Sequence, residues 1–294
     1  MHNLNLKDWH MLFRTEHALI TFFGVLIGEL LVTRSFSFSL LFPTIGPVLI
    51  TLGAFVINDY FGLRTDKANG RRDRPLVSGK IKPETALHAA ILLFAFGLAF
   101  TWFVNTFVFL LAAVYVFLTL LYDNVFKKLP LVGNLFIALT MTAPFIYGNF
   151  AVANDFVPSV ILIVIIAFLT GTGRELIITL RDVVGDKRAG GTTLPMLIGP
   201  KNTVILSAIL VSIAVLLSFV PLLSFLNFLP FLEKTSSNAE VLYVGLVSIS
   251  DYLLLTAVFK TLKSQDLFTL KECRNKTLLA LVIGVLAFLG FALL

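Results

Sequence analysis

Two aspartate-bearing segments stand out in a chain that is otherwise poor in charge. Asp182 and Asp186 are four residues apart, so on a helix their carboxylates project from the same face. Asp59 and Asp66 form a second segment, roughly 120 residues earlier in the chain. Carboxylates this close to one another repel, and in a partly dry cavity they acquire a proton or a counterion. We therefore expect a cation to bind between them.

Magnesium suits these side chains better than zinc. It takes oxygen ligands and is typically held by a few carboxylates together with phosphate oxygens of a substrate. Zinc favours His and Cys, and the chain has only four scattered His and one Cys. Basic residues lie beside the aspartates and could neutralise phosphate. This mixture predicts a metal-bridged diphosphate, and the candidate diphosphate-binding residues are Arg72, Arg74, Lys127 and Arg174.

The segments that carry the aspartates resemble one another. Nine residues separate Asp66 from Pro75, and nine separate Asp186 from Pro195. Each proline is followed four residues later by a glycine. This repeated spacing predicts two four-helix units in parallel orientation, with a ninth helix added. Inverted repeats would instead place the two segments on opposite membrane faces.

The elements that must position these residues are membrane helices. The 294 residues are 57% hydrophobic and 14% charged, with a mean hydropathy of +0.93, which is too apolar for an ordinary soluble domain. Apolar runs near the roughly 20 residues that cross a bilayer recur along the chain, without the alternation of a membrane barrel. We predict an all-α protein with nine transmembrane helices, at residues 18–33, 38–57, 83–104, 107–122, 131–152, 157–179, 203–223, 241–259 and 277–294.

The distribution of charge predicts the topology. With the N-terminus cytoplasmic and the C-terminus outside, all of the 23 Lys and Arg residues except Arg34 and Lys234 lie inside. The net charge of +6 is then explained by topology and gives no reason to expect nucleic acid as a partner. The loops at 58–82 and 174–201 both face the cytoplasm. Cys273 lies on a predicted cytoplasmic loop and, as the single cysteine, excludes an intrachain disulfide.

These residues resemble the UbiA superfamily of intramembrane prenyltransferases, whose signatures read NDxxDxxxD and DxxxD, each followed by an RPxxSG or TLP element. The resemblance covers nearly the whole chain, so residues 1–294 are expected to form a single integral-membrane prenyltransferase domain. A Y-x4-K and GN pattern between the two signatures is also present. The matching residues are Asn58, Asp59 and Asp66, then Arg74-Pro75 and Ser78-Gly79, Tyr122 with Lys127 and Asn134, Asp182 with Asp186, and Thr193-Leu194-Pro195.

The resemblance implies a multi-pass enzyme of the cell membrane whose helices surround a central cavity open to the cytoplasm. It implies magnesium-dependent transfer of a prenyl group, geranylgeranyl or similar, from its diphosphate to a lipophilic acceptor, by ionisation of the allylic diphosphate. No obligate protein partner is expected. The implied metal ligands are Asn58, Asp59, Asp66, Asp182 and Asp186, with Asp59, Asp182 and Asp186 catalytic, and the implied cavity residues are Tyr122 and Asn134. His17, near the start of the first apolar run, is a further candidate for the cavity, although packing in the core or at the interface is the commoner role for such a histidine.

The chain departs from the family pattern in its first signature. Gly62 stands where the middle aspartate is expected, and one extra residue lies between Asn69 and Arg74. The number of magnesium ions is therefore left open, and the second aspartate pair carries more weight. The RPLVSG wording resembles archaeal members that alkylate geranylgeranylglyceryl phosphate, but enzymes acting on aromatic quinone precursors share the signatures.

Two other classes of membrane protein are alternatives. A transporter or channel is the leading alternative without prenyl transfer, but its site should lie at mid-membrane on broken helices, whereas the charge here is at helix ends. A CDP-alcohol phosphotransferase also uses magnesium in a membrane. Its D-x2-D-G-x2-A-R-x8-G-x3-D-x3-D run is absent from the chain.

Overall fold

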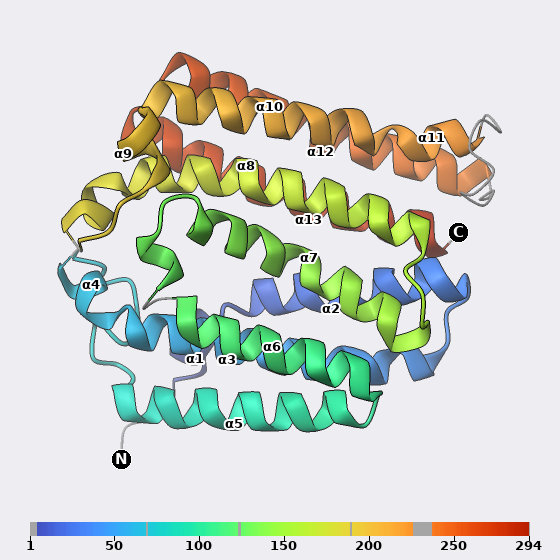
Figure 1. Cartoon of the computed structure of the whole chain (residues 1–294), viewed down its shortest axis with the longest axis horizontal. Helices are drawn as coiled ribbons and strands as arrows, with labels where there is room; N and C mark the ends of the chain where they lie inside the picture. The colour runs from blue at the N-terminus through green and yellow to red at the C-terminus, as the bar shows by residue number, and fades with distance from the viewer. Residues whose placement is uncertain (1–4, 69, 123–124, 189, 226–236, 294) are drawn as a thin grey trace.

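The computed structural model describes residues 5–68, 70–122, 125–188, 190–225 and 237–293. Within these residues every regular element is a helix, as predicted (Figure 1). The helices are α1 (Leu6–Phe13), α2 (Thr15–Thr33), α3 (Leu41–Phe61), α4 (Leu63–Ala68), α5 (Pro83–Trp102), α6 (Thr106–Tyr122), α7 (Val132–Val152), α8 (Pro158–Arg188), α9 (Leu194–Ile198), α10 (Pro200–Ser218), α11 (Val220–Phe225), α12 (Ser237–Lys263) and α13 (Leu267–Leu293), with short 3-10 turns at Phe38–Leu40 and Phe126–Lys128.

Eight of these helices are long and apolar enough to cross a membrane, counted over the described residues. A further apolar helix, α6, is shorter at 17 residues. Helices suit this setting because each satisfies its own backbone hydrogen bonds where no water is available. The chain is therefore an integral membrane protein.

The helices form a bundle that closes on itself. Successive long helices pack against one another from α2 to α13, and α13 returns to pack against α2. At the α2–α7 contact the backbones nearly touch, because a Cβ added at Gly148 would lie 2.1 Å from the Val25 carbonyl oxygen. Small residues allow such close approach between membrane helices. In both halves the second long helix packs on the third, α3 on α5 and α8 on α10, although the internal repeat stays a prediction.

Both aspartate segments lie at one end of this bundle. Figure 1 shows α4, the final turns of α8 and α9 together at the left, whereas the last turn of α13 lies at the opposite end. The predicted gathering of the polar segments is thus seen in the fold, because helices α3 and α8 both run toward this end.

Parts of the predicted loops are helical instead. Two of the long helices are longer than predicted: α8 continues to Arg188, nine residues beyond the predicted end at 179, and α13 begins at Leu267, ten residues before the predicted start at 277. The short helices α4 and α9 also lie in segments predicted as loops. Cys273, predicted on a loop, is therefore on α13 and fully buried, and its thiol donates to the Ala257 carbonyl oxygen at 3.3 Å. Charged residues mark the edge of the membrane, but a helix can continue beyond that edge, which is why hydropathy placed these ends wrongly.

Candidate active site

Asp59 is the buried centre of the first aspartate segment. It lies on the last turn of α3 and is only 2% exposed. Its Oδ1 accepts a hydrogen bond from Arg14 Nη2 at 2.7 Å and another from Arg74 Nη1 at 2.9 Å. A buried carboxylate is costly unless it is paired and hydrogen-bonded, and here two guanidinium groups meet that need.

Arg74 joins Asp59 to Asp66. The Arg74 Nη1 group also donates to Asp66 Oδ2, so one guanidinium contacts both carboxylates. The chain returns from α4 toward the site through Gly70, whose φ of +67° lies in the left-handed region that glycine adopts readily. Burial raises the pKa of Asp66, with Arg74 opposing this shift. The first segment is therefore an assembled acid–arginine cluster.

The second aspartate segment is more open. Asp182 and Asp186 lie on the last two turns of α8, and both are partly exposed. Arg181 forms a fork onto Asp182, with Nε donating to Oδ1 at 2.7 Å. In the described part of the chain no hydrogen bond or ion pair reaches the Asp186 carboxylate.

The two segments share one electrostatic environment. The hydrogen bond from Arg71 to Asp73 raises the pKa of Arg71, and the charges of Asp66 and Asp182 raise it further. Lys127, on the turn after α6, acts electrostatically on both Asp66 and Asp186. Arg71 and Lys127 therefore each lie within electrostatic range of both segments.

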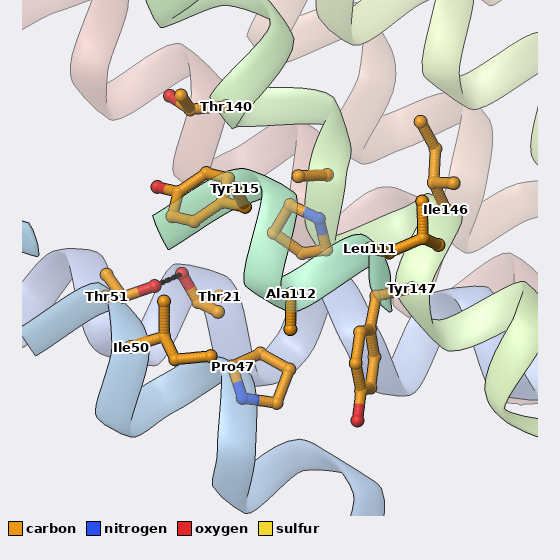
Figure 2. Close-up of a pocket in the computed structure, with 12 residues that line it drawn as sticks. Thr21, Pro47, Ile50, Thr51, Leu111, Ala112, Tyr115, Thr140, Ile146 and Tyr147 are labelled. Atoms are coloured by element: carbon orange, nitrogen blue, oxygen red, sulfur yellow. Dashed lines mark hydrogen bonds between the residues drawn. The ribbon is translucent and has the colours of Figure 1, made fainter. Parts of the chain in front are cut away.

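A mainly apolar cavity of about 130 Å³ lies deeper in the bundle, between α2, α3, α6 and α7 (Figure 2). The hydroxyls of Thr21 and Thr51 hydrogen-bond at its edge, 3.0 Å apart, and the Tyr115 ring lies along another side. Thr51 precedes Asp59 by eight residues on α3, which is about 12 Å along a helix. The cavity therefore lies further along the bundle axis, away from its charged end.

The other predicted site residues are placed as follows. Asn134 joins helices, because its Nδ2 donates to the Glu175 carbonyl oxygen at 3.3 Å and to the Thr179 hydroxyl. Tyr122 stacks on Phe136 with ring centroids 5.4 Å apart. The further placements are Asn58, half-buried beside Asp59; Arg72, exposed on the loop after α4; His17, edge-on to Phe55 at 4.8 Å; and Arg174, buried on α8.

Residues 18–235 match the sequence profile of the UbiA prenyltransferase family. This match covers most of the chain, including both aspartate segments. The chain belongs to the UbiA prenyltransferase family. Similarity to individual members extends further, since a digeranylgeranylglyceryl phosphate synthase of Archaeoglobus fulgidus is 32% identical over 97% of this chain and 94% of its own length.

Solved structures of the UbiA family agree in fold. A structure concerning digeranylgeranylglyceryl phosphate synthase in membranes superposes with a TM-score of 0.72 and 27% identity, covering 98% of both chains. A UbiA homologue from Archaeoglobus fulgidus bound to GPP and Mg²⁺ superposes with a TM-score of 0.64 and 18% identity, covering 96% of this chain and 99% of the homologue. The resemblance of the sequence to the UbiA superfamily, and to its archaeal digeranylgeranylglyceryl phosphate synthase branch, is confirmed.

Sequence reasoning missed Arg14, which the structure places at this UbiA-type site. Arg14 lies at the break between α1 and α2 with a φ of +48°, and its guanidinium lies over the Phe55 ring, 4.8 Å from the centroid. Burial lowers the pKa of Arg14, while Asp59 opposes that shift. Its position just before the first apolar run could have indicated a site residue, but charged residues at that position are equally well explained as determinants of membrane topology.

The structure also clarifies Gly62, the departure from the UbiA signature. A Cβ added at Gly62 would lie 2.9 Å from the Asn58 carbonyl oxygen and 3.5 Å from Asp66 Oδ2, so a side chain here requires a small shift of the end of α3. The position of the missing aspartate therefore faces the same carboxylate cluster. Glycine here removes a third negative charge from a site whose two carboxylates are already paired with arginines.

Proposed function

We propose that this chain transfers a geranylgeranyl group from geranylgeranyl diphosphate to the free hydroxyl of geranylgeranylglyceryl phosphate. The observation that carries the proposal is the convergence of both aspartate segments, with their arginines, at one end of a membrane-embedded bundle above an apolar cavity. Support for this acceptor comes from the relative of 32% identity that is a digeranylgeranylglyceryl phosphate synthase.

The donor atoms at the site fit magnesium. Asp59, Asp66, Asp182 and Asp186 offer oxygen ligands, and Asn58 lies beside them. Within the described residues no three acidic, His or Cys side chains are already arranged around one point. Magnesium is commonly held by one or two carboxylates with waters and phosphate oxygens, so an incomplete protein shell fits it. A bound magnesium ion would neutralise the leaving diphosphate.

Cationic side chains supply the rest of the diphosphate site. Arg74 already lies between two carboxylates, and Lys127 acts on both segments. When a diphosphate enters, the guanidinium of Arg74 and the ammonium of Lys127 can form charge-assisted hydrogen bonds with it. Arg72 is exposed and is the other residue proposed to bind the diphosphate. Stabilising negative charge as it develops on the leaving group lowers the barrier to ionisation.

The prenyl chain extends from this site toward the apolar cavity. The cavity is about 130 Å³, smaller than the several hundred cubic ångströms of a typical ligand pocket, so a geranylgeranyl chain must also continue along the helices or into lipid. Its apolar lining keeps water from the allylic cation, which the acceptor hydroxyl oxygen attacks while that hydroxyl loses its proton. The carbon–oxygen bond to the diphosphate breaks and an ether bond forms.

The proposal includes a nine-span topology for a single domain over residues 1–294. The N-terminus and the active site face the cytoplasm, and the C-terminus lies outside. Support comes from the charge distribution and from α6 as a short ninth span. Single cysteines placed at exposed Ser35 and Lys82 test it, because an impermeant maleimide applied outside intact cells should label Ser35→Cys and not Lys82→Cys.

The acceptor is tested with a panel of substrates. Purified protein in lipid nanodiscs receives labelled geranylgeranyl diphosphate, Mg²⁺ and one of three acceptors: geranylgeranylglyceryl phosphate, hydroxybenzoate or dihydroxynaphthoate. Mass spectrometry should find the ether of the glyceryl phosphate. A prenylated aromatic ring as the main product would refute the proposed acceptor, and no product with any acceptor would refute the proposed donor chemistry.

A further inference from the structure

Helix α8 carries a basic stripe beside its acidic one. Arg174 and Arg181 are seven residues apart, which is close to two full turns, so they lie on nearly the same face. Glu175 and Asp182 are also seven apart and lie on the neighbouring face. The acidic stripe leads to the aspartate cluster. The basic stripe is not needed to hold a metal and requires its own explanation.

The basic stripe lies where α8 meets α2 and α13. These three helices pack against one another in pairs. Arg174 and Arg14 both act electrostatically on His17 of α2. Arg14, Arg174 and Arg181 all act on Arg274 of α13. Cationic groups from three helices are thus collected in one place. Glu175 and Asp182 of α8 balance part of their charge, and an anionic ligand would balance the rest.

Several donors in this cluster lack partners. Arg174 is 5% exposed, and although its Nη1 donates to Glu175 at 3.1 Å, its Nε has no hydrogen-bond partner. His17 Nδ1 is likewise buried without a hydrogen-bond partner, with Glu16 Oε1 3.4 Å away. Buried donors are nearly always satisfied in native proteins, so the free Arg174 Nε and His17 Nδ1 point to a ligand. Arg274 is exposed beside them, and within the described residues no hydrogen bond or ion pair reaches its guanidinium, which leaves it available to the same ligand.

We propose that His17, Arg174 and Arg274 bind the phosphate monoester of the acceptor. This inference rests on the proposed function and assigns its two anions, the donor diphosphate and the acceptor phosphate, to different binding groups. The donor diphosphate needs a metal and lies against the aspartates, whereas the acceptor phosphate binds guanidinium forks directly, without metal. Arg174 then serves the acceptor and not the donor diphosphate predicted from sequence. The glyceryl head lies at the α2–α8–α13 junction, and its lipid tail lies among the membrane-facing helices.

The test compares the acceptor with and without its phosphate, and the acceptor phosphate with the donor diphosphate. Arg174→Gln and Arg274→Gln each remove one guanidinium, the second from an exposed position where folding is not at risk. Lys82→Gln is the charge-matched control, on exposed surface immediately before α5. Initial rates give KM separately for geranylgeranyl diphosphate, for geranylgeranylglyceryl phosphate and for dephosphorylated geranylgeranylglycerol. Equilibrium binding of labelled geranylgeranylglyceryl phosphate is measured in EDTA without donor.

In both arginine variants the KM for geranylgeranylglyceryl phosphate should rise roughly 10- to 100-fold, and the affinity for it should fall by a similar factor, because a charge-assisted hydrogen bond is lost. Their KM for the donor should stay within about twofold, and their preference for the phosphorylated acceptor should shrink. The inference is overturned if the donor KM rises as much as the acceptor KM, or if binding in EDTA is unchanged in both variants.

Failure of the proposed function gives a different result. A wild-type protein that forms no product but binds geranylgeranylglyceryl phosphate in EDTA, in a manner dependent on Arg174 and Arg274, would refute the transfer reaction and uphold the phosphate site. Product formation with arginine-independent binding would refute the phosphate site alone.

Discussion

Replacing Asp59 with asparagine should cost both stability and activity. Asp59 is almost fully buried and accepts from two arginines. A hydrogen bond to a charged group contributes about 1.5–3 kcal/mol and one between neutral groups about 0.5–1.5 kcal/mol. Asparagine keeps an acceptor oxygen but no charge, so each of the two bonds weakens by about 1 kcal/mol. The free energy of unfolding should therefore fall by about 2 kcal/mol.

Asp73→Asn is the matched control for this change. Asp73 also accepts a fork from an arginine, Arg71, with both nitrogen–oxygen distances at 3.1 Å, but its side chain is 66% exposed. Exposed ion pairs contribute less than about 1 kcal/mol. The same substitution in the same segment should thus leave stability and activity nearly unchanged.

Two assays separate these effects. Thermal unfolding in detergent should show a lower Tm for Asp59→Asn than for Asp73→Asn. Release of diphosphate from labelled geranylgeranyl diphosphate, measured below the Tm of every variant, should fall at least about 100-fold only in Asp59→Asn, the scale expected for losing an electrostatic group at the reacting centre. Equal Tm losses in both variants, or full activity of folded Asp59→Asn, would refute this account of the site.

Three further predictions concern neighbouring residues. Because burial raises the folded-state pKa of Asp66, its contribution to stability is present at low pH and is lost as pH rises through that pKa; Asp66→Asn should therefore be as stable as wild type, or more so, at neutral pH in thermal unfolding, while losing diphosphate release. Asn134→Ala should lower the free energy of unfolding by about 1–2 kcal/mol by releasing α7 from α8, with donor KM unchanged, and a large rise in donor KM would instead place Asn134 in the substrate cavity. Gly62→Asp should lower the Mg²⁺ concentration needed for half-maximal activity, since the new Cβ lies 3.5 Å from Asp66 Oδ2 and needs only a small shift from the Asn58 carbonyl oxygen at 2.9 Å; an unchanged Mg²⁺ titration would contradict this.

The sequence predicted the membrane helices and the gathering of the aspartates because both follow from general rules. Apolar runs must cross the bilayer, and helices of alternating direction bring equivalent loops to one face. The extensions of α8 to Arg188 and of α13 back to Leu267 could not be predicted from hydropathy, because they lie beyond the apolar segments. Arg14 reaches Asp59 only through the turn between α1 and α2 and the packing of α2 on α3. Such a contact between distant residues depends on tertiary geometry.

The two aspartate segments are unequal in the charge that remains for a metal ion. In the first, Asp59 and Asp66 meet Arg14 and Arg74, so two carboxylates are balanced by two guanidinium groups. In the second, Arg181 balances its neighbour on α8, and the described residues provide no hydrogen bond or ion pair to the Asp186 carboxylate.

An incoming cation gains most where negative charge is least compensated, so the second segment should bind the first magnesium ion more tightly. The first segment can contribute its carboxylates only as its arginines turn toward the diphosphate. Metal and donor should therefore bind cooperatively, with Arg74 exchanging a carboxylate for a phosphate. This physical reason for favouring the second segment does not depend on Gly62. The glycine at that position independently indicates, from sequence alone, that the second segment binds magnesium more tightly than the first.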